Sequence, residues 1–256
     1  MIFETHAHYD DRKFDEDRDS LLLSMREHGI DKIVNIGCDR ATCEATLKLV
    51  DQYDFVYGAL GVHPSDIDTM DEELYAWIRQ QLHHPKIVAV GEIGLDYYWD
   101  KEEEVQKTQR EWLSRQLELA KEAGLPFVIH SRDAAADTFD LIKAHHTEAS
   151  RGIIHCFSYS KEMAKEYVKM GYYIGVGGVV TFKNARKLKE VVEAIPTEHI
   201  VLETDCPYMA PEPYRGKRNS SLYLPYVAEK IAQIKGITTE EVEKITYRNA
   251  QDLFGI

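Results

Sequence analysis

Short apolar runs alternate with longer amphipathic stretches along the whole chain. The runs are rich in Val and Ile, which is typical of parallel strands buried on both faces. The stretches between them place apolar residues on one face at helical spacing. The pattern predicts strands at residues 1–8, 31–37, 55–62, 86–92, 126–130, 152–155, 172–176 and 199–205. It predicts helices at residues 41–52, 71–82, 102–122, 134–145, 161–170, 185–194, 222–235 and 239–253, and a first helix that is capped at residues 17–20 and stopped by Gly29.

This alternation predicts a TIM-type (β/α)8 barrel with an extra C-terminal helix. Dividing 256 residues by eight units gives about 32 residues per unit, close to the roughly 30 residues that one strand and its helix need. No proline-rich linker or low-complexity tract interrupts the alternation, so we expect one domain over residues 1–256. An open, doubly wound sheet is the alternative, but no glycine-rich nucleotide fingerprint follows the first strand to favour it.

Composition narrows the class of protein. The net charge is −13, which argues against a broad electrostatic grip on nucleic acid. No apolar run approaches the length of a membrane span, and the first residues are acidic rather than those of a secretion signal, so we expect a cytoplasmic protein that binds no membrane. The four cysteines form no C-x-x-C pair, so we expect reduced thiols. Strand alternation turns Cys156 and Cys206 away from the residues before them, so we expect these two thiols to fill the core.

Histidine and carboxylate residues stand where the predicted strands end. His6 and His8 are two apart on the first strand, so both side chains face the same side. A histidine at one strand end is more often structural than a metal ligand, and the interpretation therefore rests on the whole set. In a barrel the carboxyl ends of all strands converge on one face. The residues at these ends are His6, His8, His63, Glu92, His130, His155 and Asp205.

So many nitrogen and carboxylate donors suit two metal ions that share a bridging group better than one tetrahedral ion. We interpret Glu92 as the bridge. One ion would be held by His6, His8, Glu92 and Asp205, and the other by Glu92, His130 and His155. A hydroxide held between such ions is a strong nucleophile at neutral pH. Asp205 is then placed to act as the general base.

The same residues lie in motifs that resemble those of the TatD family of metal-dependent deoxyribonucleases. The resemblance spans nearly the whole chain. It rests on His6-x-His8-x-Asp10, Gly61-Val62-His63-Pro64, Gly91-Glu92-Ile93-Gly94-Leu95-Asp96, Ile129-His130-Ser131-Arg132, His155-Cys156-Phe157-Ser158, Glu203-Thr204-Asp205-x-Pro207-Tyr208 and the tail Pro211-x-Pro213-x-Arg215-Gly216-Lys217-Arg218-Asn219.

The resemblance implies a (β/α)8 fold and metal ligands at His6, His8, Glu92, His130, His155 and Asp205. It also implies magnesium-dependent cleavage of DNA, exonucleolytic from a 3′ end and on single strands. Mixed nitrogen and oxygen sites accept several divalent ions, so Zn²⁺, Mn²⁺ and Ni²⁺ are further candidates. The sequence departs from the family pattern at Glu4, where Asp is usual, and at Tyr159, where Gly is usual.

Substrate contacts are predicted near the same strand ends. Arg215, Lys217 and Arg218 form a compact basic cluster after the eighth strand, which is either a phosphate contact or a solvated loop. His63 and Arg132 are further candidates for phosphate contact. Aromatic residues after a strand either stack on bases or anchor loops. The aromatic candidates are Tyr97, Tyr98, Trp99 and Phe157.

We therefore expect a phosphodiesterase that binds its DNA substrate weakly, because an acidic protein grips mainly at its metals. An amidohydrolase-type enzyme that acts on a small lactone, amide or phosphotriester is the alternative, since the spacing of the ligands does not exclude it. A non-catalytic binding protein is the third possibility. No protein partner follows from the sequence.

Overall fold

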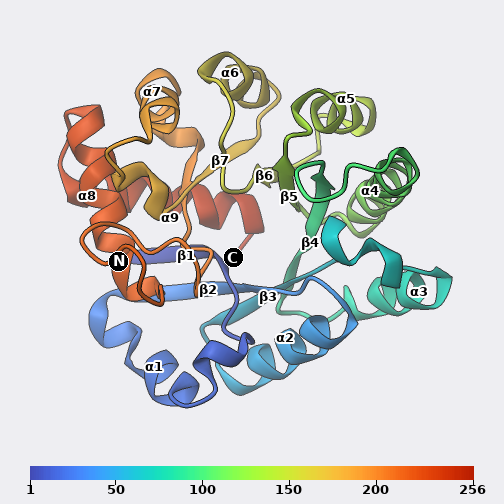
Figure 1. The fold of residues 1–256 in the computed structure, drawn as a ribbon. Helices are drawn as coiled ribbons and strands as arrows, with labels where there is room; N and C mark the ends of the chain where they lie inside the picture. The colour runs from blue at the N-terminus through green and yellow to red at the C-terminus, as the bar shows by residue number, and fades with distance from the viewer. The chain divides into compact units, whose positions relative to one another are not determined.

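Eight strands alternate with helices in the computed structural model, which describes residues 1–256 (Figure 1). The strands are β1 (Ile2–Ala7), β2 (Ile30–Ile36), β3 (Val56–Leu60), β4 (Ile87–Asp96), β5 (Phe127–Arg132), β6 (Gly152–Ile154), β7 (Tyr173–Val176) and β8 (Ile200–Leu202). The helices are α1 (Arg18–Ser24), α2 (Arg40–Gln52), α3 (Glu72–Gln81), α4 (Glu103–Ala123), α5 (Ala135–His145), α6 (Lys161–Lys169), α7 (Arg186–Ala194), α8 (Leu224–Lys235) and α9 (Thr239–Phe254). None of these helices combines the length and the apolar character that a bilayer span requires.

The strands follow one another in the sheet in chain order, from β1 to β8. This order, with parallel strands separated by helices, confirms the predicted TIM-type (β/α)8 fold class. The chain divides into two compact units, which we describe separately. Unit 1 comprises Met1–Asn35 and Cys156–Ile256, and unit 2 comprises Ile36–His155. That residues 1–256 form one domain stays a prediction.

In unit 1, the first and the last strand lie next to each other. A parallel bridge joins Ala7, at the end of β1, to Cys206, which follows β8. The additional helix α9 packs on these strands: the rings of Phe3 and Phe254 lie 5.7 Å apart, and Asn249 Nδ2 donates to the Ile200 carbonyl at 2.7 Å. The predicted capping signal is present, because the Thr238 hydroxyl accepts from Glu241 N and the Glu241 carboxylate accepts from Thr238 N. The predicted C-terminal helix is therefore confirmed.

In unit 2, β3, β4, β5 and β6 pair in parallel, in that order. β4 is longer than predicted: it continues past Glu92 to Asp96, and all ten of its residues are buried. Its last part pairs with β5, which sets Gly94 beside His130 and Asp96 beside Arg132. The α4 helix ends at Gly124, whose φ of 67° is the left-handed conformation that glycine adopts without strain. Because β4 extends to Asp96, this strand carries two acidic residues, Glu92 and Asp96, whereas the predicted strand contained only Glu92.

Several ionisable side chains lie in the cores, which is unusual because burial of an unpaired charge is costly. Glu4, His6 and Glu203 in unit 1 are at most 1% exposed. Glu92 and Asp96 in unit 2 are 4% and 1% exposed. Each unit thus contains acidic groups that need a partner, and their partners define the candidate site.

Candidate metal centre

In unit 1, three predicted ligands converge at the end of β1. Asp205 N donates to the His6 carbonyl at 2.9 Å and His8 N donates to the Cys206 carbonyl at 2.9 Å, so backbone hydrogen bonds fix both sides of the cluster. The Nε2 atoms of His6 and His8 are 3.2 Å apart. Asp205 Oδ1 lies 3.6 Å from His6 Nε2 and 3.2 Å from His8 Nε2. The three side chains therefore aim one ligand atom each at a common point.

The spacing of these three atoms fits a coordinated ion. Bonds of about 2.0 to 2.1 Å to a tetrahedral ion place the ligand atoms about 3.3 Å apart, and octahedral coordination places neighbouring ligand atoms slightly closer. Two of the three separations, both 3.2 Å, lie in that range, and the third, 3.6 Å between His6 Nε2 and Asp205 Oδ1, is slightly longer. Asp205 also has a φ of 55°, a left-handed conformation that is uncommon for a residue other than glycine and that often occurs at functional sites.

A buried carboxylate holds the backbone behind this cluster. Glu4 accepts hydrogen bonds from His6 N at 3.1 Å, from Thr204 N at 2.9 Å and from the Ser221 hydroxyl at 2.9 Å. Burial raises the pKa of Glu4 to about 8 against the effect of these donors. Glu4 thereby ties the strand that carries His6 to the segment that carries Asp205, although it is no ligand itself.

In unit 2, three histidines surround one carboxylate oxygen. Glu92 Oε1 lies 3.1 Å from His130 Nδ1, 3.9 Å from His63 Nε2 and 3.9 Å from His155 Nε2. The other oxygen, Oε2, lies 3.9 Å from the thiol of Cys38. Glu92, His63 and His130 could together hold a metal ion. The structure thus places near Glu92 both His130 and His155, which the sequence assigns to the second ion, and His63, which the sequence assigns to phosphate contact.

Asp96 orients His130 from the side opposite to Glu92. Asp96 Oδ2 is 3.0 Å from His130 Nε2, whereas Oδ1 accepts from Tyr98 N at 3.0 Å and from Trp99 N at 3.1 Å. Burial opposes ionisation of Asp96, but the hydrogen bonds from His130 and from these amides outweigh it and lower the pKa of Asp96. Burial likewise opposes protonation of His130, but Asp96 and Glu92 outweigh it and raise its pKa to about 9. Metal-binding histidines commonly present their second nitrogen to a carboxylate in this way.

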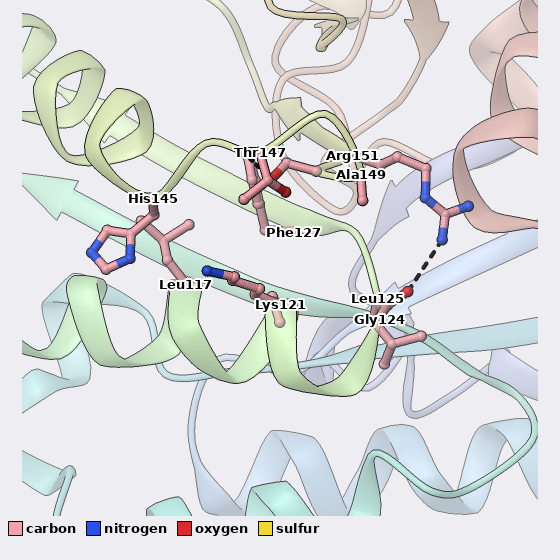
Figure 2. A pocket seen from close by; sticks show the side chains of 11 residues that line it. Leu117, Lys121, Gly124, Leu125, Phe127, His145, Thr147, Ala149 and Arg151 are labelled. Carbon is pink, nitrogen blue, oxygen red and sulfur yellow. Dashed lines mark hydrogen bonds between the residues drawn. The ribbon is translucent and has the colours of Figure 1, made fainter.

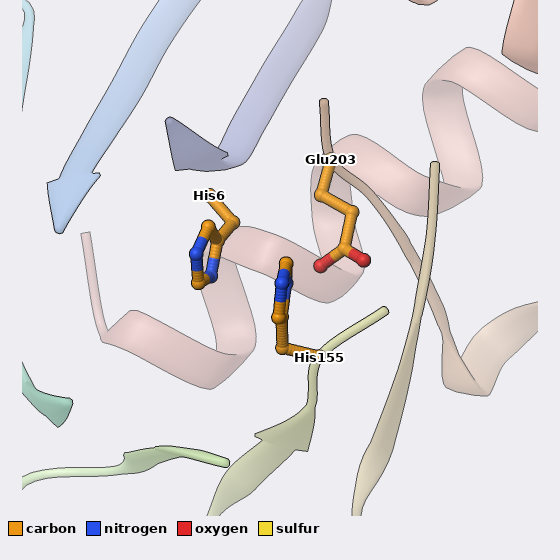
Figure 3. A group of neighbouring side chains, drawn as sticks. All are labelled: His6, His155 and Glu203. Carbon is orange, nitrogen blue, oxygen red and sulfur yellow. The ribbon is translucent and has the colours of Figure 1, made fainter. Parts of the chain in front are cut away.

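The sequence interpretation missed two acidic residues, Asp96 and Glu203. Glu203 lies two residues before Asp205, and its Oε1 accepts from Cys156 N at 2.7 Å. A Cβ at Gly175 would lie 2.3 Å from Glu203 Oε2, so any larger residue there would force this buried carboxylate to move. Figure 3 shows the side chains of Glu203 and His6 in unit 1. The alternation Glu203-x-Asp205, which matches His6-x-His8, was the available signal for Glu203.

The three residues of the predicted basic cluster have different surroundings in the structure. Arg218 forms two hydrogen bonds to the Asp17 carboxylate, at 2.7 and 2.6 Å. Arg215 stacks on the Phe182 ring at 4.3 Å, and Lys217 Nζ lies 5.9 Å from the centre of the Tyr214 ring. Arg215 and Lys217 are exposed. The structure therefore leaves these two charges open to solvent but engages Arg218 with a carboxylate.

The aromatic candidates divide in a similar way. Phe157 is 3% exposed and thus packs in the core. The Tyr97 hydroxyl donates to Asp137 at 2.6 Å and accepts from Arg110 at 3.0 Å. Burial and the neighbouring Asp137 carboxylate raise the pKa of Tyr97 to about 12. Both side chains thus have structural roles in this conformation, whereas Tyr98 and Trp99 are exposed.

A small cavity of about 70 Å³ in unit 2 is separate from these ligands (Figure 2). It is lined by residues of α4, by the end of α5 and by the first residue of β5, Phe127. His130 lies near the other end of β5. In the cavity wall, Nε2 of His145 lies 2.8 Å from the hydroxyl oxygen of Ser114. The cavity therefore lies at the start of β5, away from the candidate ligands.

Comparisons with known proteins agree with the geometry. A family model described as TatD related DNase matches residues 3–255. The chain is 46% identical over 256 residues to an uncharacterized metal-dependent hydrolase, YabD, of Bacillus subtilis (strain 168), and covers 100% of both proteins. It is 29% identical over 259 residues to a protein of Cronobacter sakazakii named 3'-5' ssDNA/RNA exonuclease TatD, covering 99% of this chain and 97% of that protein. The crystal structure of YjjV, a TatD homologue from Escherichia coli K12, has a TM-score of 0.93 at 30% identity, covering 100% of this chain and 98% of that one.

Proposed function

Because the chain belongs to the TatD family of metal-dependent hydrolases, we propose that it cleaves phosphodiester bonds in DNA as a 3′-5′ exonuclease on single strands. The observation that carries the proposal is the convergence of histidine nitrogens and carboxylate oxygens in each unit. The name of the Cronobacter sakazakii relative, which refers to single-stranded DNA and RNA, supports the substrate class.

We propose two divalent ions, with Mg²⁺ for activity. His6, His8, Asp205 and Glu92 would hold one ion, and Glu92, His130 and His155 would hold the other. The chemistry of the donors supports bound divalent ions, because carboxylate oxygens suit Mg²⁺ and Mn²⁺ and imidazole nitrogens suit Zn²⁺. When bound, such ions supply a nucleophile at neutral pH and neutralise charge that develops on a phosphate.

The remaining functions, which are proton transfer, positioning of the ligands and phosphate contact, would fall to residues of the protein. Asp205 is the proposed general base, since its side chain is 20% exposed and therefore reachable by water, whereas that of Glu92 is 5% exposed. Asp96 would hold His130, and Glu4 would hold the backbone of His6. Arg215 and Lys217 are the candidate phosphate contacts of unit 1. With a net charge of −13, the chain should bind DNA weakly away from these groups.

The test begins with removal of bound metal by a chelator. Mg²⁺, Mn²⁺ or Zn²⁺ is then restored separately, and the protein is incubated with end-labelled single-stranded DNA, a lactone or a phosphotriester. Glu92→Ala and Asp205→Asn are the test variants. Asp51→Asn is the matched control. Asp51 Oδ1 lies 3.1 Å from His84 Nε2, so it also forms a carboxylate–histidine contact in unit 2, but this contact is exposed and involves no candidate ligand.

Metal-dependent shortening of the DNA from its 3′ end, lost in both test variants and kept in Asp51→Asn, is the expected result. Turnover of the lactone or the phosphotriester without DNA cleavage would contradict the proposal and support the amidohydrolase alternative. Absence of turnover with every metal and every substrate would also contradict it.

A further inference from the structure

Tyr98 and Trp99 form an exposed aromatic pair directly after β4. Trp99 is 67% exposed and Tyr98 is 42% exposed, which sets them apart from the other large apolar side chains of unit 2. Their rings meet edge to face, with centroids 4.7 Å apart. Their backbone is fixed, since both amides donate to Asp96 Oδ1 at 3.0 and 3.1 Å. The chain thus holds two adjacent aromatic rings in a defined position that is open to solvent, which is typical of a surface that binds a ligand.

Arg132 lies over the same rings. Its guanidinium carbon is 3.9 Å from the centre of the Tyr98 ring and 5.5 Å from that of Trp99. Two other stacked arginines of unit 2 also bind a carboxylate: Arg40, on Trp77 at 3.9 Å, pairs with Glu44 at 2.6 Å, and Arg115, on Trp112 at 4.2 Å, pairs with Glu72 at 2.6 Å. Arg132 is exposed and no carboxylate pairs with it in the structure. Its hydrogen-bond donors are therefore open to an anion in a strongly acidic protein.

This group is directly connected to a candidate metal ligand. Arg132 is two residues after His130 on β5, and it pairs with Asp96 in the sheet. Asp96 receives the amides of Tyr98 and Trp99 on one oxygen and faces His130 Nε2 at 3.0 Å with the other. A ligand on the aromatic rings would therefore lie near the metal cluster of unit 2.

We propose that Tyr98, Trp99 and Arg132 form a stacking platform that binds one base of single-stranded DNA and the phosphate attached to it. The inference rests on the proposed function. Aromatic rings stack on any base, and a planar guanidinium both stacks and binds phosphate through paired donors. The platform therefore selects a strand with unpaired bases and holds it beside the metal cluster, without selecting a sequence.

The test compares a labelled single-stranded oligonucleotide with otherwise identical strands that carry one abasic residue at successive positions from the 3′ end. Cleavage is followed as kcat and KM. Binding is followed separately, by fluorescence anisotropy with a slowly cleaved phosphorothioate strand. The test variants are Trp99→Ala and Arg132→Gln. Arg40→Gln is the matched control, because Arg40 stacks on a Trp at the same 3.9 Å distance that separates Arg132 from Tyr98.

In the wild type, an abasic residue at one position should weaken binding and raise KM by about 5-fold to 100-fold, the usual effect of one base stacked on an aromatic side chain. In Trp99→Ala, the KM for the abasic strand should be about equal to the KM for the intact strand. Arg132→Gln should raise KM for the intact strand at least about fivefold, and Arg40→Gln should change it less than about twofold.

The outcomes separate the inference from the function on which it rests. DNA cleavage without any effect of an abasic residue overturns the platform and leaves the nuclease activity standing. Base-dependent binding without cleavage overturns the nuclease activity and supports the platform. Neither binding nor cleavage contradicts both.

Discussion

Replacement of Asp96 by Asn should weaken one metal cluster and leave the other unchanged. The Asp96 carboxylate faces His130 Nε2 at 3.0 Å and holds the imidazole so that Nδ1 points at Glu92, 3.1 Å away. An Asn side chain can still accept from the amides of Tyr98 and Trp99, but it then turns its NH₂ group toward His130. The ring thereby loses the negative charge and the acceptor that fix its orientation.

The size of the effect follows from the role of Asp96. Loss of a carboxylate behind a metal-binding histidine costs about 10-fold to 100-fold in metal affinity, or about 1.4 to 2.8 kcal/mol. The ligand side chain that Asp96 contacts is His130, which belongs to the cluster of unit 2. Only the binding event assigned to His130 should therefore change.

The assay is isothermal titration calorimetry of the metal-free protein with Mn²⁺. Two binding events are expected in the wild type, and one of them should weaken in Asp96→Asn. Asp100→Asn is the matched control, since Asp100 lies in the same segment and accepts from Gln109 at 2.7 Å without touching a candidate ligand. Circular dichroism verifies the fold of both variants. Equal affinities in the wild type and Asp96→Asn would refute the orienting role of Asp96.

Three further predictions concern stability. Mn²⁺ at a hundred times its dissociation constant should stabilise the metal-free protein by about 2.7 kcal/mol and raise Tm by about 5 °C for a chain of 256 residues, and an unchanged Tm in calorimetry would contradict specific binding. Burial raises the folded-state pKa of Glu4 to about 8, so the folded state retains a proton that the unfolded state releases. The metal-free protein should therefore lose stability relative to Glu4→Gln as the pH rises from about 5 to about 8, whereas parallel pH profiles in urea denaturation would refute the shift. Gly175→Ala should destabilise the protein by about 1 to 3 kcal/mol, because the new Cβ meets the Glu203 carboxylate, and wild-type stability in the same assay would disprove that contact.

The fold could be predicted because its signals are local. Apolar runs and amphipathic stretches alternate regularly, and helix ends carry their own markers, such as Gly124 after α4 and the Thr238 capping box before α9. The end of β4 could not be predicted in the same way. Glu92 interrupts the apolar run and therefore marks the predicted end of the strand. The strand nevertheless continues to Asp96, because histidines from other strands lie against the Glu92 carboxylate.

The candidate ligands could be located at strand ends but their partners could not. The hydrogen bonds of Glu4 to Thr204 and Ser221 join residues about 200 positions apart, so no sequence spacing indicates them. The burial of Phe157 likewise depends on its packing against Tyr167, 6.3 Å away between ring centres, and not on its own neighbours in the sequence. Strand periodicity indicates which residues face a site, whereas contacts between distant segments decide which of them remain accessible.

The most direct measurement of the two-ion centre is anomalous diffraction from crystals soaked in Mn²⁺. We expect two anomalous peaks about 3.5 to 4 Å apart, one bound by His6, His8 and Asp205 and one bound by His130 and His155, with Glu92 in contact with both. If the crystals bound Mn²⁺ at full occupancy at other sites but showed no anomalous peak at these residues, this expectation would be contradicted.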